Sequence, residues 1–482
     1  MASERCELCG EALDLPVKGR PDVLCKHCRR LRRLKRVLGV IAFVFVAIAA
    51  AAPFLYRRAQ LAGLPDIGAP FDVEKFGTVV SGDDANAVLY YQAAVPPEQP
   101  DSDAVDSEGN AVDELQRALD KGWTHATPGI RAWLDSSRPT LELMKQGAKL
   151  DEAWTVQPKE QSYETFVSIG QHWPLSKLAR LEAVRLRATG SPAEAWEWLR
   201  VAFRHSRHVG MHGRAIDRLM AASFHAEVST SIPARAADSA VDSELLLTAL
   251  SNIVEDYGLT KPMSTNLRSE YFLQMDTLQR YSPASSFDAF KDESQPLLSF
   301  LRNEPEVGKR VIRLTYENWL SQCDLPKHMQ SPQRIVPPYL FEARIAGEDR
   351  ESVPVTDIER FCARSPVAMR AVGRGMPLGQ GILREQTRQK QLVVVLSAQL
   401  SFREPGRLPD TLEQILNEYL SEWPSDPFAP DQTPMGYRHE AASATAVVWS
   451  VGPDGTDSGG HVIDRWNDPG FDQGMKILTP DD

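Results

Sequence analysis

Four of the six cysteines form two pairs near the N-terminus, and their spacing is typical of a metal site. Cys6 and Cys9 form one C-x2-C pair, Cys25 and Cys28 form the other, and fifteen residues separate the pairs. Each C-x2-C turn directs two sulfurs to one point, so two turns supply the tetrahedron of thiolates that Zn²⁺ prefers. Gly10 follows the first pair and suits a turn with positive φ. Because four protein ligands leave no open position on the ion, we expect a structural rather than a catalytic zinc site.

Paired cysteines also form disulfides or redox centres. A reducing cytoplasm disfavours disulfides, and redox C-x2-C pairs normally follow a βαβ pattern that this segment lacks. With four cysteines available, His27 is not expected to bind the metal. The segment resembles zinc-ribbon-like domains, including the C-terminal finger of the DksA/TraR family, whose knuckles also read CxxCG…CxxC. The resemblance covers about the first thirty residues and implies a structural metal with a protein- or nucleic-acid-contacting role.

The other two cysteines, Cys323 and Cys362, lie far along the chain. In an oxidising compartment they could form a disulfide, which would stabilise the fold by roughly 4 kcal/mol in the chain-entropy description. Two buried free thiols are the alternative, because a sequence does not give the Cα separation that a disulfide requires.

Three histidines form a second group that could do chemistry. His205, His208 and His212 recur at spacings of three and four, which place them on one side of a helix, as metal ligands require. This side lies ~130° from the apolar face formed within residues 195–203. We therefore predict that these histidines face solvent among neighbouring arginines, and the alternative is a surface metal or catalytic site.

Known catalytic signatures are absent from the sequence. It holds no G-x-S-x-G elbow, P-loop, H-E-x-x-H or S-x-x-K motif. The absence of motifs does not exclude an enzyme, but it favours a role without catalysis.

An apolar segment follows the cysteine pairs. Residues 37–56 carry no charge over twenty positions, the length that a helix needs to cross ~30 Å of hydrocarbon. Residues 29–36 before it are strongly basic, and only Arg57 and Arg58 follow it, so the positive-inside rule places the N-terminus in the cytoplasm. A cleaved signal peptide ending near residues 49–52, or a buried core helix, would also be apolar.

Charge divides the chain in the same way. Residues 1–36 hold ten Lys/Arg and five Asp/Glu, a net charge of +5, whereas residues 57–482 hold 44 and 60, a net charge of −16. The acidic body argues against nucleic-acid binding there, because phosphate contacts need a basic surface. The basic run next to the apolar segment suits anionic lipid headgroups.

The body of the chain has helical periodicity. We expect a stem at 57–111 with one short helix at 83–94, and helices from 114 onward. Gly190 should end one helix, and the run from Ser191 to Glu194 reads as an N-cap, an N1 proline and a capping-box glutamate. Helices joined by short turns predict stacked helical hairpins.

The last hundred residues follow a different pattern. A helix at 382–402 leads into GRLPDTLEQIL, a DPF turn, a GYR strand, a strand at 445–451 and the loop SVGPDGTDSGG. This order resembles the globular part of type II secretion major pseudopilins. Two features depart from that family: more than three hundred residues separate the module from the apolar segment, and the segment lacks the glutamate of a prepilin-processing site.

In pseudopilins the C-terminal loop can bind calcium. Here the resemblance implies Asp454 and Asp457, with Asp464, as the hard oxygen ligands that Ca²⁺ prefers. The alternative is an Asp/Gly turn with solvated carboxylates.

These observations predict a multidomain, mainly α protein of the bacterial inner membrane. The expected parts are a zinc-ribbon-like cytoplasmic domain (1–36), a transmembrane helix (37–56), a stem (57–111), a helical-hairpin extracytoplasmic domain (112–380) and a small α+β module (381–482). We expect an interaction or scaffold protein that contacts the lipid bilayer and unknown protein partners on both sides. An extracytoplasmic metal-dependent enzyme and an accessory component of a secretion or pilus-like system are the alternatives.

Overall fold

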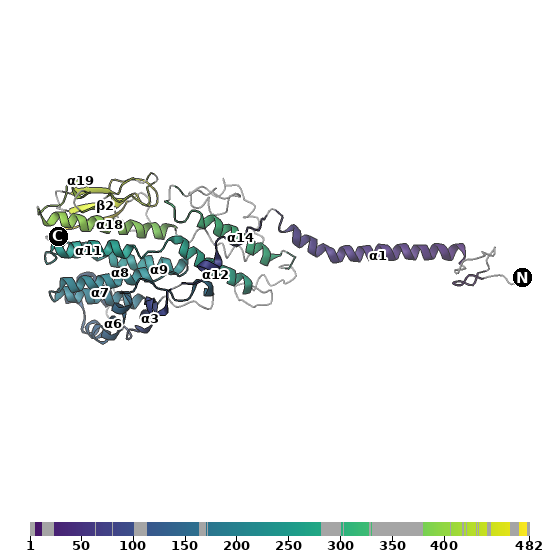
Figure 1. Ribbon diagram of the computed structural model, residues 1–482, viewed down its shortest axis with the longest axis horizontal. Coiled ribbons are helices and arrows are strands. Elements are labelled where there is room, and N and C mark those ends of the chain that lie inside the picture. Colours follow the sequence, from purple (N-terminus) through teal and green to yellow (C-terminus); the bar gives the residue numbers. More distant parts are fainter. Residues whose placement is uncertain are drawn as a thin grey trace, which may run out of the picture. The chain divides into compact units, whose positions relative to one another are not determined.

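The computed structural model is mainly helical, with one small antiparallel sheet in the part of the chain that it describes (Figure 1). The described residues are 5–11, 24–62, 64–79, 81–100, 113–162, 170, 172–280, 300–301, 303–326, 329, 379–404, 406–416, 419–420, 422–429, 431, 433–440, 445–462 and 472–479.

The helices are α1 (Lys26–Ala59), α2 (Val73–Phe76), α3 (Ala87–Ala93), α4 (Glu114–Lys121), α5 (Pro128–Ser136), α6 (Arg138–Gly147), α7 (His172–Ala188), α8 (Pro192–His208), α9 (Ala215–Thr230), α10 (Ile232–Ala236), α11 (Ser243–Tyr257), α12 (Met263–Arg280), α14 (Glu304–Leu320), α18 (Gly379–Arg403) and α19 (Glu413–Leu416). The 3-10 turns are η1 (Asp83–Ala85), η2 (Trp123–His125) and η3 (Pro158–Glu160), and the strands are β1 (Gly436–Glu440), β2 (Thr445–Ser450) and β3 (Gln473–Ile477).

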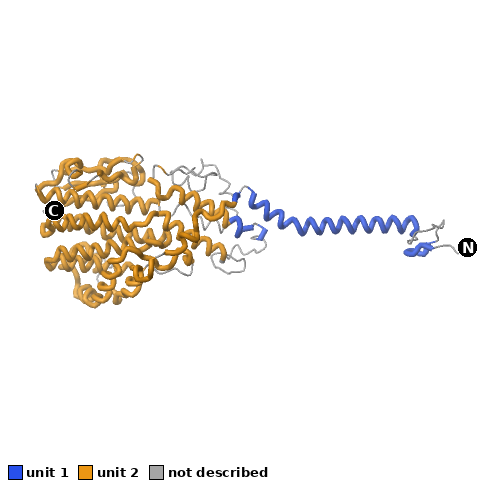
Figure 2. The backbone as a smooth tube through the Cα atoms, viewed as in Figure 1, with its two compact units in different colours: residues 1–65, 282–307 blue, residues 66–281, 308–482 orange. Residues whose placement is uncertain are grey.

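The chain divides into two compact units (Figure 2). The first unit comprises Met1–Pro65 and Ser282–Val307, and the second comprises Asp66–Tyr281 and Gly308–Asp482. The second unit therefore combines most of the predicted stem, most of the predicted helical domain and the C-terminal module.

Helix α1 dominates the first unit. It runs for 34 residues, and its most apolar window has a mean hydropathy of 2.6 and is not buried at all. By length and composition it could cross a membrane, which confirms an apolar helix where the sequence predicts one. Its insertion and its orientation stay predictions.

The C-terminal end of α1 is fixed by contacts within the first unit. The Arg57 guanidinium donates to the Phe300 carbonyl and, at 2.7 Å, to Asn303 Oδ1. It also lies 4.0 Å from the centroid of the Phe300 ring. Phe54 packs edge-on against the same ring, with 6.3 Å between ring centroids. These contacts hold the last turns of α1 beside Phe300 and Asn303.

The signals predicted to end α7 and begin α8 are confirmed only in part. Gly190 has φ +83°, the left-handed conformation that ends a helix, and Pro192 is the first residue of α8, both as predicted. The capping box is wrong, because the Ser191 side chain makes no cap hydrogen bond. The Ser191 backbone N–H donates instead to the Leu186 carbonyl at 2.9 Å, which closes the end of α7.

The helix predicted at 83–94 appears as η1 followed by α3. Val88 and Tyr91 are buried in the main apolar core, together with Leu134 and Met144 of neighbouring helices. This helix therefore lies in the folded body rather than in an extended stem.

Helix α18, predicted at 382–402, contributes to two cores through opposite sides. Leu392, Leu396 and Leu400 recur every four residues and pack into the main core of helices. Val394, Val395 and Ala398 pack against the sheet residues Ala446, Val448 and Ile477. The strands have the order β1-β2-β3, and Val448 pairs with Tyr437 on one side and Met475 on the other.

Candidate metal centre and buried polar network

The four N-terminal cysteines come together and could hold a metal ion. Their sulfur atoms all lie within 4.8 Å of one another. Cys9 Sγ lies 3.7 Å from Cys25 Sγ, close to the ~3.8 Å edge of a tetrahedron built with Zn–S bonds of about 2.3 Å. The donor set and its size therefore fit a four-coordinate ion. His27, in the same region, is exposed and does not belong to this group.

Backbone N–H groups donate to two of the four sulfurs, and one of these bonds favours the Cys6 thiolate. The Cys25 N–H donates to Cys6 Sγ at 3.4 Å, and the Cys28 N–H donates to Cys25 Sγ at 3.3 Å. The first of these bonds is the main reason that the pKa of the Cys6 thiol is lowered to about 6. Gly10 has φ +73°, as the sequence predicts, and its N–H closes the first turn on the Cys6 carbonyl at 2.9 Å.

The second cysteine pair is part of the apolar helix. Cys25 is the N-cap of α1, and Cys28 lies in its first turn. Leu24, Cys6 and Cys28 are buried together, whereas the rest of the helix up to the apolar segment is exposed. The second cysteine pair of the candidate metal centre and α1 are thus one continuous element.

The calcium prediction rests on acidic residues that the structure uses in turns. Asp457 Oδ1 accepts from Trp449 Nε1 at 3.0 Å and from the Gly459 N–H at 2.8 Å, and Asp454 Oδ1 accepts from the Thr456 N–H at 3.1 Å. Asp464 lies outside the described residues. Within the described part of the chain, the cysteine cluster is the only group of three or more candidate ligands, so calcium stays a prediction.

Asp472 is the acidic residue that sequence reasoning missed in this loop. Its two carboxylate oxygens accept from the Ser458 N–H at 3.0 Å and the Gly460 N–H at 2.6 Å. Burial raises its pKa, and Asp457 and Asp454 raise it further. No short-range pattern marked Asp472, because it reaches the loop from the start of the last strand.

The predicted disulfide cannot be placed. Cys323 is a buried free thiol, and burial raises its pKa to about 12. Cys362 lies outside the described residues, so their pairing stays a prediction.

The prediction that the three histidines face solvent is wrong. His205 and His208 are 0% and 1% exposed, and His212, which follows the end of α8, is partly buried. They also do not form one metal site, since no three candidate ligands that include them lie within 4.8 Å of one another among the described residues.

Each of these histidines is held by a residue distant in sequence. Tyr91 Oη lies 2.7 Å from His208 Nδ1, and His172 Nδ1 lies 3.0 Å from His205 Nε2. His212 Nε2 lies 2.8 Å from Glu152 Oε2. Tyr91 and His172 were not identified from the sequence, and no motif could have identified them.

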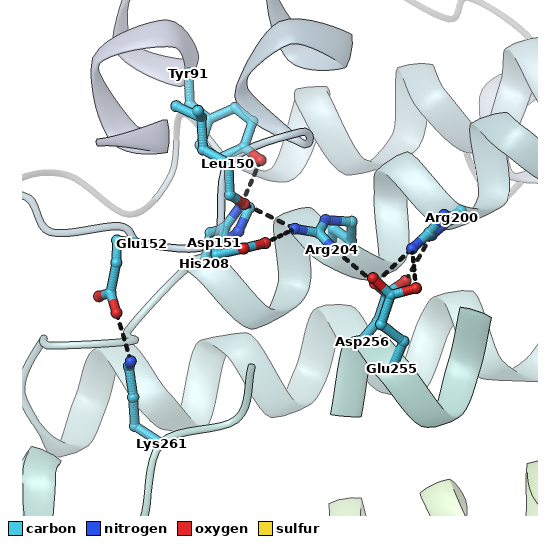
Figure 3. A network of polar contacts seen from close by, with 10 residues as sticks. All are labelled: Tyr91, Leu150, Asp151, Glu152, Arg200, Arg204, His208, Glu255, Asp256 and Lys261. Atoms are coloured by element: carbon cyan, nitrogen blue, oxygen red, sulfur yellow. Dashed lines mark hydrogen bonds and ion pairs between the residues drawn. The ribbon is translucent and has the colours of Figure 1, made fainter. Parts of the chain in front are cut away.

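An arginine network continues from this region along α8 (Figure 3). Arg204 donates to Asp256 Oδ1 at 2.7 Å, to Asp151 Oδ1 at 2.6 Å and to the Leu150 carbonyl at 2.8 Å. Arg200 reaches the second oxygen of Asp256 at 3.1 Å. Asp256 is 1% exposed, so its charge is neutralised inside the protein by two guanidinium groups.

A second charged group joins α8, α9 and α18. Glu385 of α18 has a fully buried carboxylate that forms an ion pair with Arg207 of α8 and, at 2.6 Å, with Arg218 of α9. Burial lowers the pKa of Arg207, and the Glu385 carboxylate opposes that shift. The triad joins three helices by charge as well as by apolar contact.

Acid is expected to destabilise the second unit through these buried histidines. Burial lowers the pKa of His172 to about 4 and of His208 to about 3, below the ordinary value of 6.5. The unfolded chain then binds more protons than the native chain below pH 6.5. The contribution of each histidine to the free energy of unfolding is therefore fully present above pH 6.5. It falls by about 1.4 kcal/mol per pH unit as the pH is lowered towards 4.

Urea unfolding of the full-length protein in detergent between pH 7.5 and pH 4.5 measures this slope. His208→Gln should reduce the slope below pH 6.5, whereas the exposed His125→Gln should leave it unchanged. An identical slope in the His208→Gln variant would show that burial does not keep this histidine neutral.

Comparison with known proteins gives no family assignment: no family model, curated protein or solved structure matches the chain.

Proposed function

We propose that this chain is a single-pass protein of the bacterial inner membrane that presents a zinc-bound cysteine knuckle to the cytoplasm and its helical unit to the other side. The observation that carries the proposal is the continuity of the two elements, because the second C-x2-C pair forms the start of α1. Binding of zinc by four thiolates would supply most of the folding free energy of so small a knuckle. Its role is therefore to hold a contact surface at the membrane.

Charge supports this orientation. Residues 29–36 hold six exposed Lys/Arg and no carboxylate, between the cysteine cluster and the apolar segment. Such a segment is favoured on the cytoplasmic side and attracts anionic lipid headgroups. The knuckle also exposes an apolar side chain to a partner. Leu8, between Cys6 and Cys9, is 67% exposed. An exposed leucine on a metal-ordered turn suits a protein partner with an apolar pocket.

Metal content and topology together test the proposal. Full-length protein purified from membranes should contain one zinc ion per chain. In intact spheroplasts, a tag at the C-terminus should be cleaved by external protease while a tag at the N-terminus stays protected. Protein without zinc, or protease-sensitive N-terminal tags, would refute the proposed arrangement.

Leu8→Asp separates the contact surface from the metal site. This variant should keep its zinc and its membrane insertion but lose a cross-linked cytoplasmic partner. Leu34→Asp, an exposed position on α1 outside the knuckle, is a matched control that should keep the partner. Partner binding that survives Leu8→Asp would contradict the proposed contact.

A further inference from the structure

A cavity in the second unit is lined by largely buried side chains that each have a polar group without a hydrogen bond. It lies between the loop after α6, the start of α7, the end of α8 and the start of α9, and the space between its lining residues amounts to about 530 Å³, part of it open to solvent.

Three of the lining side chains are more than nine-tenths buried and make no hydrogen bond at one of their polar atoms. They are Trp154, 6% exposed, Gln161, 5% exposed, and His172, 6% exposed. Within the described part of the chain, no bond is made by the Trp154 indole N–H, by the Gln161 carboxamide or by His172 Nε2, whose ring is held through its other nitrogen. These polar atoms are not fully enclosed by protein, so a molecule that enters the cavity can reach and bond each of them. Three such groups around one cavity therefore form a set of hydrogen-bonding positions for a bound molecule.

The cavity carries no unbalanced charge. Arg214 and Asp217, both at its edge, form an ion pair with a distance of 3.1 Å. His212 contacts Glu152, and the charge of that carboxylate is balanced by Lys261 at 2.7 Å. The unpaired groups supply two certain N–H donors, a carbonyl acceptor and an imidazole nitrogen that can take either role.

The walls of the cavity are fixed in advance. Asn86 makes two hydrogen bonds to the backbone of Trp154, at 2.8 and 3.0 Å. On the opposite wall, Asn266 Nδ2 donates to the carbonyls of Gly210 and Gly213, at 2.6 and 2.9 Å. A ligand would therefore meet donors and acceptors that need no reordering.

We infer that this cavity binds a small uncharged ligand rich in hydrogen-bonding groups, with a carboxamide or neighbouring hydroxyls contacting Gln161, Trp154 and His172. The inference does not depend on the zinc centre or on the orientation in the membrane. It gives the helical unit a binding role of its own.

Three small probes test the ligand class on the full-length protein in detergent micelles. Acetamide represents the carboxamide, glucose represents the hydroxyls, and acetate has the shape of acetamide but carries a charge. Saturation-transfer NMR at equal probe concentrations should detect acetamide, glucose or both. The probe that binds more tightly identifies the source as amide-like or sugar-like, and acetate should not bind. Equal binding of acetate, or no binding of either uncharged probe, would overturn the inference and leave a cavity that holds water only.

Variants place the binding in this cavity. Gln161→Leu removes a donor and an acceptor at nearly constant volume and should weaken the better probe about tenfold. Gln146→Leu, an exposed position on α6, is the matched control and should not change the affinity. Trp154→Phe removes only the indole N–H and part of the ring, and it should also weaken binding. This variant replaces Gln161→Leu in the test if that variant does not fold. Unchanged affinity in both cavity variants would refute the site.

Discussion

Cys28→Ser should abolish zinc binding by the full-length protein. Cys28 is 7% exposed and packs with Cys6 and Leu24, so its sulfur cannot be replaced by a ligand from solvent without opening the knuckle. A serine hydroxyl does not ionise near neutral pH and is a poor ligand for zinc. Because the apparent binding free energy of structural zinc is about 10–16 kcal/mol, losing one of four ligands should also unfold the turn at Cys6–Gly10.

The first measurement is the zinc content per chain of protein purified from membranes. Limited proteolysis then tests whether the residues before α1 have become unfolded. Cys323→Ser is the matched control, since Cys323 is also a buried free thiol but lies in the second unit. It should keep one zinc per chain. Retention of zinc by Cys28→Ser, or its loss in the control, would contradict the four-cysteine site.

Glu385→Gln should cost about 3–5 kcal/mol of unfolding free energy, the usual effect of removing one partner from a buried ion pair. The substitution keeps the shape of the side chain but leaves Arg207 and Arg218 buried without a carboxylate. Since these residues come from α8, α9 and α18, the loss should appear as a lower urea midpoint of the whole second unit.

Two further variants make this result specific. Glu142→Gln, at an exposed position on α6, should change stability by less than about 0.5 kcal/mol. Replacing all three charges by Met or Leu should recover much of the lost stability, because an apolar group of similar volume needs no counter-ion. If the triple variant is no more stable than Glu385→Gln, unpaired charge is not the cause of the loss.

Local patterns predicted the elements that depend on neighbouring residues. The cysteine pairs, the positive φ of Gly10, the apolar helix, the end of α7 at Gly190, helix α18 and the first two strands of the C-terminal segment all follow from short-range spacing. The third strand, β3, was not predicted.

The histidine prediction failed because it assumed that α8 has one buried side. Both sides of this helix are covered by other helices, so the side opposite Leu199 is buried as well, and its polar residues bond internally. The partners explain why no pattern could show this: Tyr91 lies 117 residues from His208, and Glu385 lies 167 residues from Arg218. Only tertiary packing brings such residues together.

Helix α18 has one more consequence. Since its leucines belong to the core of helices and its valines to the core under the sheet, neither core is complete without the same 25 residues. Melting of one core therefore removes a wall from the other, and the two should lose their structure in a single cooperative transition. For the same reason the final hundred residues are not expected to fold as an independent domain. A chain cut before α18 would leave the remaining helices with an exposed apolar surface.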